Sequence, residues 1–372
     1  MIVPGSPEEL AEALASAQRS RQSIHLCGNS TKDRMGGPIC HADVRISTAG
    51  LNRLLQYEPS DLTISVEAGI TYRELTRVLA KNRQMIPLDP AFSDSATAGG
   101  IVAANASGPR RRLYGTARDM VIGMTFVTLE GKLIRSGGMV VKNVAGLDMG
   151  KLMIGSFGTL AAVAVINFRL HPMPAGTRTF VREFVRATEA ITARDKILKS
   201  SLQPAAIDIV KTAAGYDLMI QAGGSTAVLD RYSSELAGAR VLEGAEENSL
   251  WERIREFTPQ FLRENENGVV VRISCTLSEV GRVLEALPAP ALARAGSGVC
   301  YGYFPKAGDL RHLKDVYSKG VGKSVVEFAP QSVRETAELW PEPGSDFAMM
   351  KKVKEMFDPQ YLLNRGRLYG RI

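Results

Sequence analysis

Features that mark membrane, secreted and fibrous proteins are missing from this sequence of 372 residues. No apolar run reaches about 18 residues, and the N-terminus lacks the basic-then-apolar order of a secretion signal. We therefore expect neither a membrane span nor export. No internal repeat, heptad pattern or low-complexity segment is present either, which argues against a solenoid or a coiled coil. Together these absences predict a globular protein of the cytoplasm.

Cysteine is scarce, with four residues in the chain and no C-x-x-C pair. Scattered thiols do not make a disulfide framework, so the sequence favours a reducing compartment. The motifs His25-x-Cys27 and Cys40-His41 together offer four metal-ligand side chains, but they lack the spacing of a zinc finger. We predict no metal site and interpret His25 and Cys27 as residues of a buried strand.

Acidic residues are outnumbered, and the formal net charge is +7. The basic residues are dispersed, and the densest run is Arg110-Arg111-Arg112. No nucleic-acid recognition motif accompanies this charge, so we predict no nucleic-acid partner. The charge favours an anionic substrate, an acidic protein partner or at most a peripheral contact with the inner face of the cell membrane.

Glycine, by contrast, is concentrated in residues 87–170, which hold 12 of the chain's 35 glycines. The glycines lie in clusters between short β-branched runs. Glycine lets main-chain N–H groups approach a flat ligand or a pyrophosphate closely. A bed for a large, planar, anionic cofactor and a β-rich domain with ordinary glycine turns both account for this composition.

The order of the motifs decides between these two interpretations. The segment contains, in sequence, ATAGGIVAANASG at residues 96–108, YGTARD at 114–119, KNVAGLD at 142–148 and GSFGTL at 155–160. This series resembles the FAD domain of the vanillyl-alcohol oxidase/p-cresol methylhydroxylase (PCMH) family, and within it the FAD-binding subunits of bacterial glycolate oxidases. The resemblance is strong over about residues 20–175 and weak over the C-terminal tail.

The expected fold class is α+β, in three parts. The resemblance implies a two-part PCMH-type FAD-binding domain over residues 1–175, an α+β cap domain over 176–340 and a closing segment over 341–372 that returns to the flavin domain. His-Pro-Met-Pro at residues 171–174 and Pro-Glu-Pro-Gly at 341–344 mark the two boundaries.

Periodicity and capping residues predict the individual elements. In the first part we expect a helix capped by Ser6, a strand over residues 23–27, a strand over 62–66, a helix capped by Thr71, a hairpin over 125–134 and a strand over 160–170. In the cap we expect strands over 205–210, 217–221, 269–274 and 299–304, and helices over 225–236, 249–257, 278–287 and 309–318. A last helix is expected over 349–357.

FAD requires N–H donors for its pyrophosphate, a flat surface for the isoalloxazine and an apolar slot for adenine. The loop GNSTKD at residues 28–33 follows a strand, which suits a phosphate cradle, and it resembles the family's first pyrophosphate loop. Residues 96–100 are the second expected source of N–H donors. The residues that we expect to contact the cofactor are Gly28, Asn29, Ser30, Thr31, Lys32, Ala96, Thr97, Gly99, Gly100, Ala103, Asn105, Ser107, Gly108, Tyr114, Gly115, Asp119, Gly155, Gly158, Thr159, Ile166 and Asn364.

For three of these residues a second interpretation stays open. Asp119 and Thr159 equally suit turns in which their side chains bond backbone, and Lys32 equally suits a solvated surface. Two positions depart from the family: Ala161 follows Gly-Thr-Leu where relatives often have glycine, and Arg365 replaces the proline after Asn364. Residues 28–33 contain no histidine to bond the flavin, so we expect non-covalent FAD.

No catalytic residue is assigned from the sequence. Oxidation of a 2-hydroxy acid requires a base near the hydroxyl and a cation for the carboxylate. Related catalytic subunits carry a His-x-Gly-Asp-Gly-Asn motif in the cap, which this cap lacks. Its one histidine, His312, is interpreted as facing solvent or as hydrogen-bonded within the protein. The arginine run at residues 110–112 equally suits binding of a substrate acid, an exposed loop or a subunit contact.

The resemblance implies an FAD-dependent oxidoreductase subunit that oxidises glycolate or another small 2-hydroxy acid. Its partners would be a catalytic flavoprotein subunit and an iron–sulfur subunit that takes the electrons. Two alternatives remain: a stand-alone FAD-dependent 2-hydroxy acid oxidoreductase, and a structural subunit with a vestigial flavin site.

Overall fold

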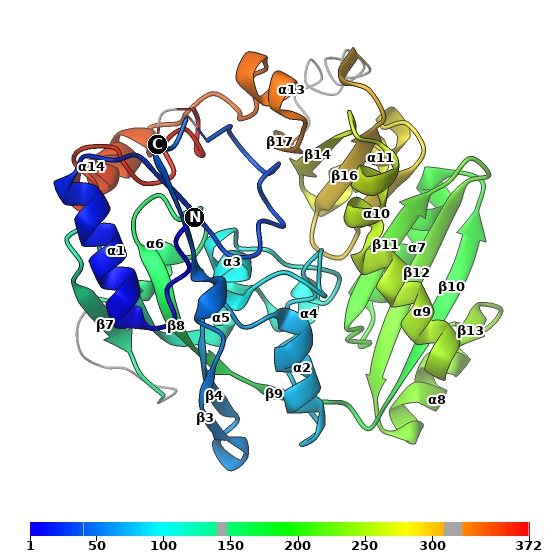
Figure 1. Ribbon diagram of the computed structural model, residues 1–372. Helices are drawn as coiled ribbons and strands as arrows, with labels where there is room; N and C mark the ends of the chain where they lie inside the picture. The colour runs from blue at the N-terminus through cyan, green and yellow to red at the C-terminus, as the bar shows by residue number, and fades with distance from the viewer. Residues whose placement is uncertain (40, 140–146, 309–321, 371) are drawn as a thin grey trace. The chain divides into compact units, whose positions relative to one another are not determined.

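The computed structural model describes residues 1–39, 41–139, 147–308, 322–370 and 372. Contacts divide the chain into two compact units (Figure 1). Unit 1 comprises Met1–Ser107, Gly115–Met173 and Glu342–Ile372, and unit 2 comprises Gly108–Tyr114 and Pro174–Pro341. Cys40, residues 142–146 of the KNVAGLD motif, and the helix expected over 309–318 with His312 lie outside the described residues.

Unit 1 contains three sheets. β1 (Ile24–Cys27) and β2 (Val44–Ser47) form a parallel pair. An antiparallel sheet has the strand order β3-β4-β8-β6-β7, and β5 pairs with β9. These strands are β3 (Leu54–Glu58), β4 (Thr63–Glu67), β5 (Gln84–Met85), β6 (Val121–Val127), β7 (Leu133–Gly137), β8 (Ala162–Arg169) and β9 (His171–Pro172).

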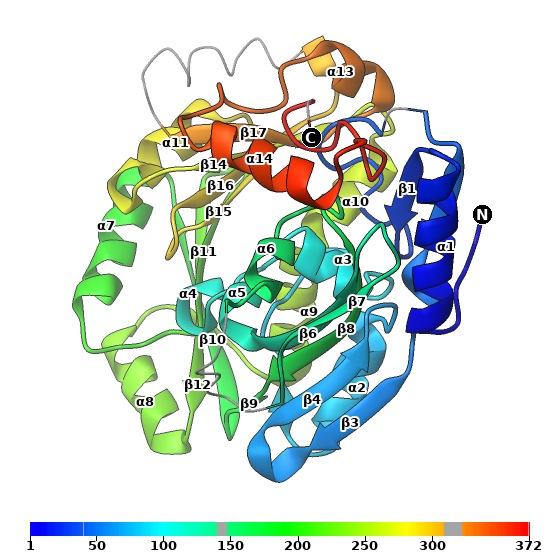
Figure 2. The same ribbon diagram turned by 90° about the vertical axis from the view of Figure 1, so that its left-hand side faces the viewer.

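The helices of unit 1 are mostly short. They are α1 (Pro7–Arg19), α2 (Tyr72–Ala80), α3 (Ala98–Ala103), α5 (Ala117–Met120), α6 (Gly150–Met153) and α14 (Phe347–Phe357), with 3₁₀ turns η1 (Thr48–Gly50) and η2 (Pro59–Asp61). α1 lies beside β1 (Figure 2), where Leu10 and Leu14 pack with Ile24 and with Leu363 of the C-terminal segment. A parallel bridge joins Ile24 to Leu363, so the end of the chain extends the small parallel sheet.

Unit 2 is built on one antiparallel sheet with the strand order β13-β10-β12-β11-β15-β16-β14-β17. Its strands are β10 (Gly176–Phe184), β11 (Ala206–Lys211), β12 (Tyr216–Gly224), β13 (Arg240–Leu242), β14 (Val269–Ser274), β15 (Ala291–Arg294), β16 (Val299–Phe304) and β17 (Lys323–Phe328). Its helical elements are α4 (Arg111–Tyr114), α7 (Ala187–Lys199), α8 (Thr226–Glu235), α9 (Gly244–Arg255), α10 (Phe257–Glu264), η3 (Leu277–Glu279), α11 (Val280–Ala286) and α13 (Gln331–Thr336).

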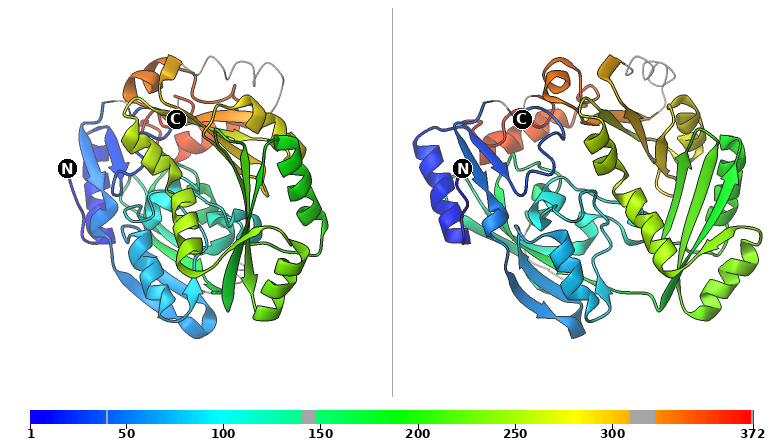
Figure 3. Two further views of the ribbon diagram at one scale, coloured as in Figure 1. Left: turned by 90° about the vertical axis from the view of Figure 1, so that its right-hand side faces the viewer. Right: turned by 45° about the vertical axis from the view of Figure 1, so that its right-hand side comes forward.

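Helices cover both faces of this sheet (Figure 3). Phe180 of β10 stacks on Tyr232 of α8, with 6.1 Å between ring centroids, in the core that α7 and α11 complete. The preceding residue of β10, Thr179, accepts a hydrogen bond from Trp251 of α9 at 2.8 Å. Because neighbouring strand residues point to opposite faces, α8 and α9 lie on opposite sides of the sheet.

The segment expected as one helix over residues 249–257 contains parts of two helices. α9 already begins at Gly244, and α10 begins at Phe257, with Pro259 as its third residue. Proline is tolerated in the first turn of a helix, where its missing N–H has no intrahelical partner to lose. Among the described residues, no helix is both long and apolar enough to cross a bilayer.

Candidate functional site

A pocket in unit 1 gathers segments that lie far apart in the sequence. It is formed by the end of β1, the loop that follows it, α3, the turn before β8 and two residues of the C-terminal tail. Its lining residues are His25, Leu26, Cys27, Gly28, Asn29, Ser30, Thr31, Lys32, Asp33, Thr48, Thr97, Gly99, Gly100, Ala103, Ala104, Phe157, Gly158, Ala161, Val163, Asn364 and Arg367.

The loop over residues 28–33 is held from both of its sides. Ser47, at the end of β2, donates from Oγ to the carbonyl of Gly28 at 3.0 Å, and the side-chain amide of Asn29 donates to the carbonyl of Ser95 at 2.9 Å. A Cβ at Gly28 would lie 2.3 Å from Thr97 Oγ1. The loop therefore packs against the start of α3 so closely that only glycine fits there.

Three consecutive main-chain amides of this loop are available to a ligand. Among the described residues, no acceptor is found for the amides of Asn29, Ser30 and Thr31. The turn closes after them, where the amide of Asp33 donates to the carbonyl of Ser30 at 3.1 Å. A row of main-chain N–H groups without protein acceptors, beside a pocket, suits an anionic ligand such as a phosphate.

The side chains around the loop carry an excess of positive charge. Arg45 Nη2 lies 3.0 Å from Asp33 Oδ2 and also donates to Ser30 Oγ, and His25 Nε2 lies 3.6 Å from Asp33 Oδ1. Burial acts to raise the pKa of Asp33, but the His25 hydrogen bond and the nearby cations bring it below its ordinary value. Asp33 is thus ionised at neutral pH and fixes Arg45, while Lys32 lines the pocket itself.

Arg367, from the C-terminal segment, fixes the loop from the other side. Its Nη2 donates to the carbonyl of Lys32 at 2.9 Å and its Nη1 to that of Asp33 at 3.2 Å. Its guanidinium carbon lies 5.8 Å from the centroid of the Phe157 ring. With both carbonyls bound to a cation, the loop can direct its N–H groups into the pocket.

Asn364 also lines the pocket, but the protein uses its whole side-chain amide. Oδ1 accepts from the amide of Leu26 at 2.8 Å, and Nδ2 donates to the carbonyls of Leu26 at 3.1 Å and Phe157 at 2.8 Å. Asn364 therefore ties β1 to the turn before β8. The expected contact from Asn364 to a cofactor is better described as positioning, since its polar atoms have protein partners.

Another part of the lining is apolar. It consists of Leu26, Ala103, Ala104 and Val163, beside Gly99, where an added Cβ would lie 2.8 Å from Ala68 Cβ. The amide of Phe157 donates to the carbonyl of Ala103 at 2.9 Å, which joins the turn before β8 to α3. Small side chains on one wall and free amides on the other suit a ligand with a flat ring and a phosphate.

The structure brings 11 of the 21 expected cofactor residues to this pocket. They are Gly28, Asn29, Ser30, Thr31, Lys32, Thr97, Gly99, Gly100, Ala103, Gly158 and Asn364. It does not bring Ala96, Asn105, Ser107, Gly108, Tyr114, Gly115, Asp119, Gly155, Thr159 or Ile166 to its lining.

Several of these residues have structural roles of their own. Asp119 Oδ2 accepts the amide of Thr116 at 2.8 Å and completes the capping box of α5, and Thr159 Oγ1 donates to the carbonyl of Ser156 at 2.7 Å. The turn interpretation thus accounts for both side chains. Ile166 is fully buried in the middle of β8, where it packs in the sheet. Gly108 and Tyr114 belong to unit 2.

Ten lining residues lie outside the expected contact set: His25, Leu26, Cys27, Asp33, Thr48, Ala104, Phe157, Ala161, Val163 and Arg367. Of these, Asp33 belongs to the loop expected to cradle phosphate, and Ala161 is one of the two departures from the family. His25, Leu26 and Cys27 immediately precede the recognised loop, and Asp33 ends it. Their position next to the loop could therefore have predicted that they line the pocket. Arg367 lies in the closing segment that was expected to return to the flavin domain, but nothing local indicates its partners Lys32 and Asp33, which lie more than 330 positions away.

Comparison with known proteins covers the part of unit 1 that supplies β1, the loop after it and α3 to the pocket. Residues 1–137 match a family model described as FAD binding domain. Over 372 aligned residues, 98% of each chain, the sequence is 28% identical to glycolate oxidase subunit GlcE of Escherichia coli (strain K12). It is also 28% identical over 210 residues to glycolate oxidase subunit GlcD of Bacillus subtilis (strain 168), which covers 56% of this chain and 45% of that one.

A solved structure supports the fold over nearly the whole chain. Alkyldihydroxyacetonephosphate synthase superposes with a TM-score of 0.73 over 97% of this chain and 75% of that protein. The sequence identity of the two is 18%, so this likeness concerns the architecture alone.

Proposed function

Since the chain belongs to the FAD-linked oxidoreductases with a PCMH-type FAD-binding domain, we propose that it is the FAD-binding subunit of a complex that oxidises glycolate or a similar 2-hydroxy acid. The observation that carries this proposal is the pocket of unit 1, in which the amides of Asn29, Ser30 and Thr31 lie beside Lys32. FAD, once bound, supplies an acceptor for the two electrons that leave the substrate.

The residues of the pocket suit this cofactor. The three free amides and Lys32 would hold the pyrophosphate, with Arg367 keeping the loop in position through its carbonyls. The small residues of α3 and of the turn before β8 would contact the flat ring systems. No histidine lies within residues 28–33, which supports a non-covalent cofactor.

The assembly with other subunits rests on the relatives. A relative that matches over 98% of its length is called glycolate oxidase subunit GlcE, and a second relative is called glycolate oxidase subunit GlcD. The four cysteines of this chain form no C-x-x-C pair. We therefore propose a catalytic flavoprotein and an iron–sulfur protein as cytoplasmic partners, with the cluster outside this chain.

Purification of the full chain tests the cofactor. The preparation should be yellow, and acid precipitation should leave free FAD in the supernatant. Flavin that stays with the precipitate would contradict the non-covalent part of the proposal. A colourless protein that cannot be reconstituted with FAD would favour a purely structural subunit.

Affinity purification from the native host tests the assembly. A tagged copy of the chain should retain a second flavoprotein and an iron–sulfur protein, and glycolate should bleach the flavin absorbance of the complex. Recovery of the tagged chain alone, with bleaching by glycolate in the absence of any partner, would favour a stand-alone oxidoreductase.

A further inference from the structure

A buried arginine on the sheet of unit 2 has hydrogen-bond donors that the protein does not use. Arg294, the last residue of β15, is 8% exposed. Its Nη1 donates to Asp208 of β11, which is fully buried. In the part of the chain that the structure describes, this is the guanidinium's one hydrogen bond, and Nε is buried without a partner. A buried donor left unsatisfied costs about 1–3 kcal/mol and therefore requires an explanation.

The free donors form one edge of the guanidinium. Because Asp208 takes Nη1, the N–H of Nε and the neighbouring N–H of Nη2 remain as a parallel pair. This pair matches the two oxygens of a carboxylate, which a lysine ammonium at the same place would contact only as a point charge. The chemistry of the site thus selects a small anion with two coplanar oxygens.

Strand register places further polar groups on the same face. Ile209 lies opposite Ala293, so Asp208 and Arg294 both point away from the core that α7 and α11 complete. Tyr301 of β16 lies opposite Leu292, two residues before Arg294, and shares this face. The guanidinium carbon of Arg294 lies 5.9 Å from the centroid of the Tyr301 ring.

The charges that act on Tyr301 favour an anion. Arg272 lies opposite Tyr301 in the register of β14 and β16, with its Nε 3.3 Å from Glu327 Oε1. Arg111 of α4 is a third cation that acts on Tyr301, beside Arg294 and Arg272, and among the described residues Glu327 is the one carboxylate that acts on it. Burial raises the pKa of Tyr301 to about 12, which keeps its hydroxyl a neutral donor at physiological pH.

We propose that Arg294 and Tyr301 form a binding site for a small carboxylate on unit 2, with Asp208 positioning the guanidinium. The Nε–Nη2 edge binds the two carboxylate oxygens, and the Tyr301 hydroxyl donates to the same ligand. The choice of a 2-hydroxy acid as this ligand rests on the proposed function. In that case this chain binds the acid itself, instead of serving only as a carrier of electrons.

Calorimetric titration of the full chain, as purified, with glycolate and with oxalate tests the site. Arg294→Met alone would leave Asp208 as a buried carboxylate without its cation. The charge-removing variant is therefore Arg294→Met with Asp208→Asn. We expect it to raise Kd about tenfold or more. Arg294→Lys should also weaken binding, because it keeps the charge and loses the paired donors. Tyr301→Phe should weaken binding less, since one donor is lost.

Arg282→Met is the matched control, because Arg282 is an exposed arginine of α11, which packs on the other face of the sheet. Its Kd should equal that of the unaltered protein. Should the double variant fail to fold, Arg294→Lys and Tyr301→Phe decide the question. An unchanged Kd in these variants, or no binding of either acid to the unaltered protein, overturns the inference.

Flavin content, read from absorbance in the same samples, separates this inference from the proposed function. A yellow protein that binds neither acid refutes the carboxylate site and leaves the flavin assignment intact. A colourless protein that binds glycolate through Arg294 refutes the flavin assignment and retains the carboxylate site.

Discussion

Lys354 and Asp358 form an ion pair that is fully shielded from solvent, with Nζ 2.6 Å from Oδ2. Lys354 also donates to the carbonyls of Thr159 at 2.7 Å and Leu363 at 3.0 Å, and Asp358 accepts the amides of Leu362 and Leu363. Burial lowers the pKa of Lys354, an effect that the attraction of Asp358 opposes. The pair fastens α14 and the tail to the turn before β8, beside Asn364 and Arg367.

Replacing Lys354 with methionine should destabilise the protein strongly. The change leaves Asp358 as a buried charge without its cation, for which about 3–5 kcal/mol of the free energy of unfolding is a typical loss. Urea unfolding of the apo protein measures it. Lys351→Met, at an exposed position of the same helix, should cost under about 1 kcal/mol. Equal stability of the two variants would contradict the role assigned to the pair.

Replacing Gly28 with alanine should weaken FAD binding about tenfold or more. The new Cβ would lie 2.3 Å from Thr97 Oγ1, which forces the loop away from α3 and displaces its amides. Fluorescence titration of the apo protein with FAD measures the affinity. Gly138→Ala is the control, since nothing lies within 4 Å of a Cβ there. If both variants bind FAD equally, the loop over residues 28–33 does not hold the pyrophosphate.

Replacing Asn364 with aspartate separates positioning from direct contact. A carboxylate oxygen would face the carbonyls to which Nδ2 now donates, so the apo protein should lose about 1–3 kcal/mol of stability. FAD affinity should fall as a consequence. Thermal unfolding without FAD is the deciding measurement. A variant that keeps its apo stability and loses only FAD affinity would show that Asn364 binds the cofactor itself.

The stabilising effect of Asp33 should depend on pH in the acid range. Its pKa is below the ordinary value of 3.8, so the folded state resists protonation and gains stability from the ionised carboxylate above that pH. The gain is lost as the pH falls through the lowered pKa. The difference in free energy of unfolding between the unaltered protein and Asp33→Asn should therefore shrink on acidification from pH about 5.

Arg45→Met tests whether the charge of Arg45 causes the pH dependence of the stabilisation by Asp33. Because Arg45 lies 3.0 Å from Asp33, removing its charge should reduce the difference between aspartate and asparagine at residue 33. A difference that is independent of pH in the presence of Arg45 would contradict the account of the loop.

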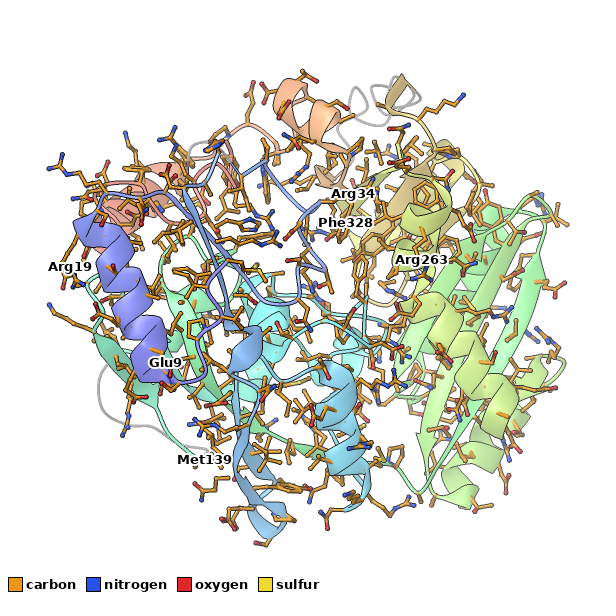
Figure 4. All side chains as sticks on the ribbon, viewed as in Figure 1. Glu9, Arg19, Arg34, Met139, Arg263 and Phe328 are labelled. Carbon is orange, nitrogen blue, oxygen red and sulfur yellow. The ribbon has the colours of Figure 1, made fainter. Side chains whose placement is uncertain are left out.

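Local signals were sufficient where an element is determined by its own residues. Ser6 accepts the amide of Glu9 at 3.1 Å, as the cap pattern predicts, and Glu9 and Arg19 mark the two ends of α1 (Figure 4). β14 and β16 have the predicted bounds, because β14 is rich in β-branched residues and β16 in aromatic residues, and both kinds suit a buried strand. The loop over residues 28–33, by contrast, was recognised through the resemblance, since its own residues equally suit a surface turn.

Interactions between distant segments could not be predicted. Lys354 looks like any lysine of an exposed helix, and only the folded tail brings Thr159 to it. Arg294 carries no motif, and its partner Asp208 is identified by strand order alone. Ile166 was assigned to the cofactor through the resemblance, whereas its place in the centre of β8 is set by the sheet.

The hydrogen bond from Leu26 to Asn364 joins residues 338 positions apart. A ribosome that has made β1 must add the whole of unit 2 before Asn364 and Arg367 emerge. During most of synthesis the nascent chain therefore contains β1 and the loop after it, but not the two C-terminal residues that hold them in place. A complete pocket therefore requires the C-terminal segment, whose Asn364 and Arg367 hold the turn before β8 and the loop over residues 28–33.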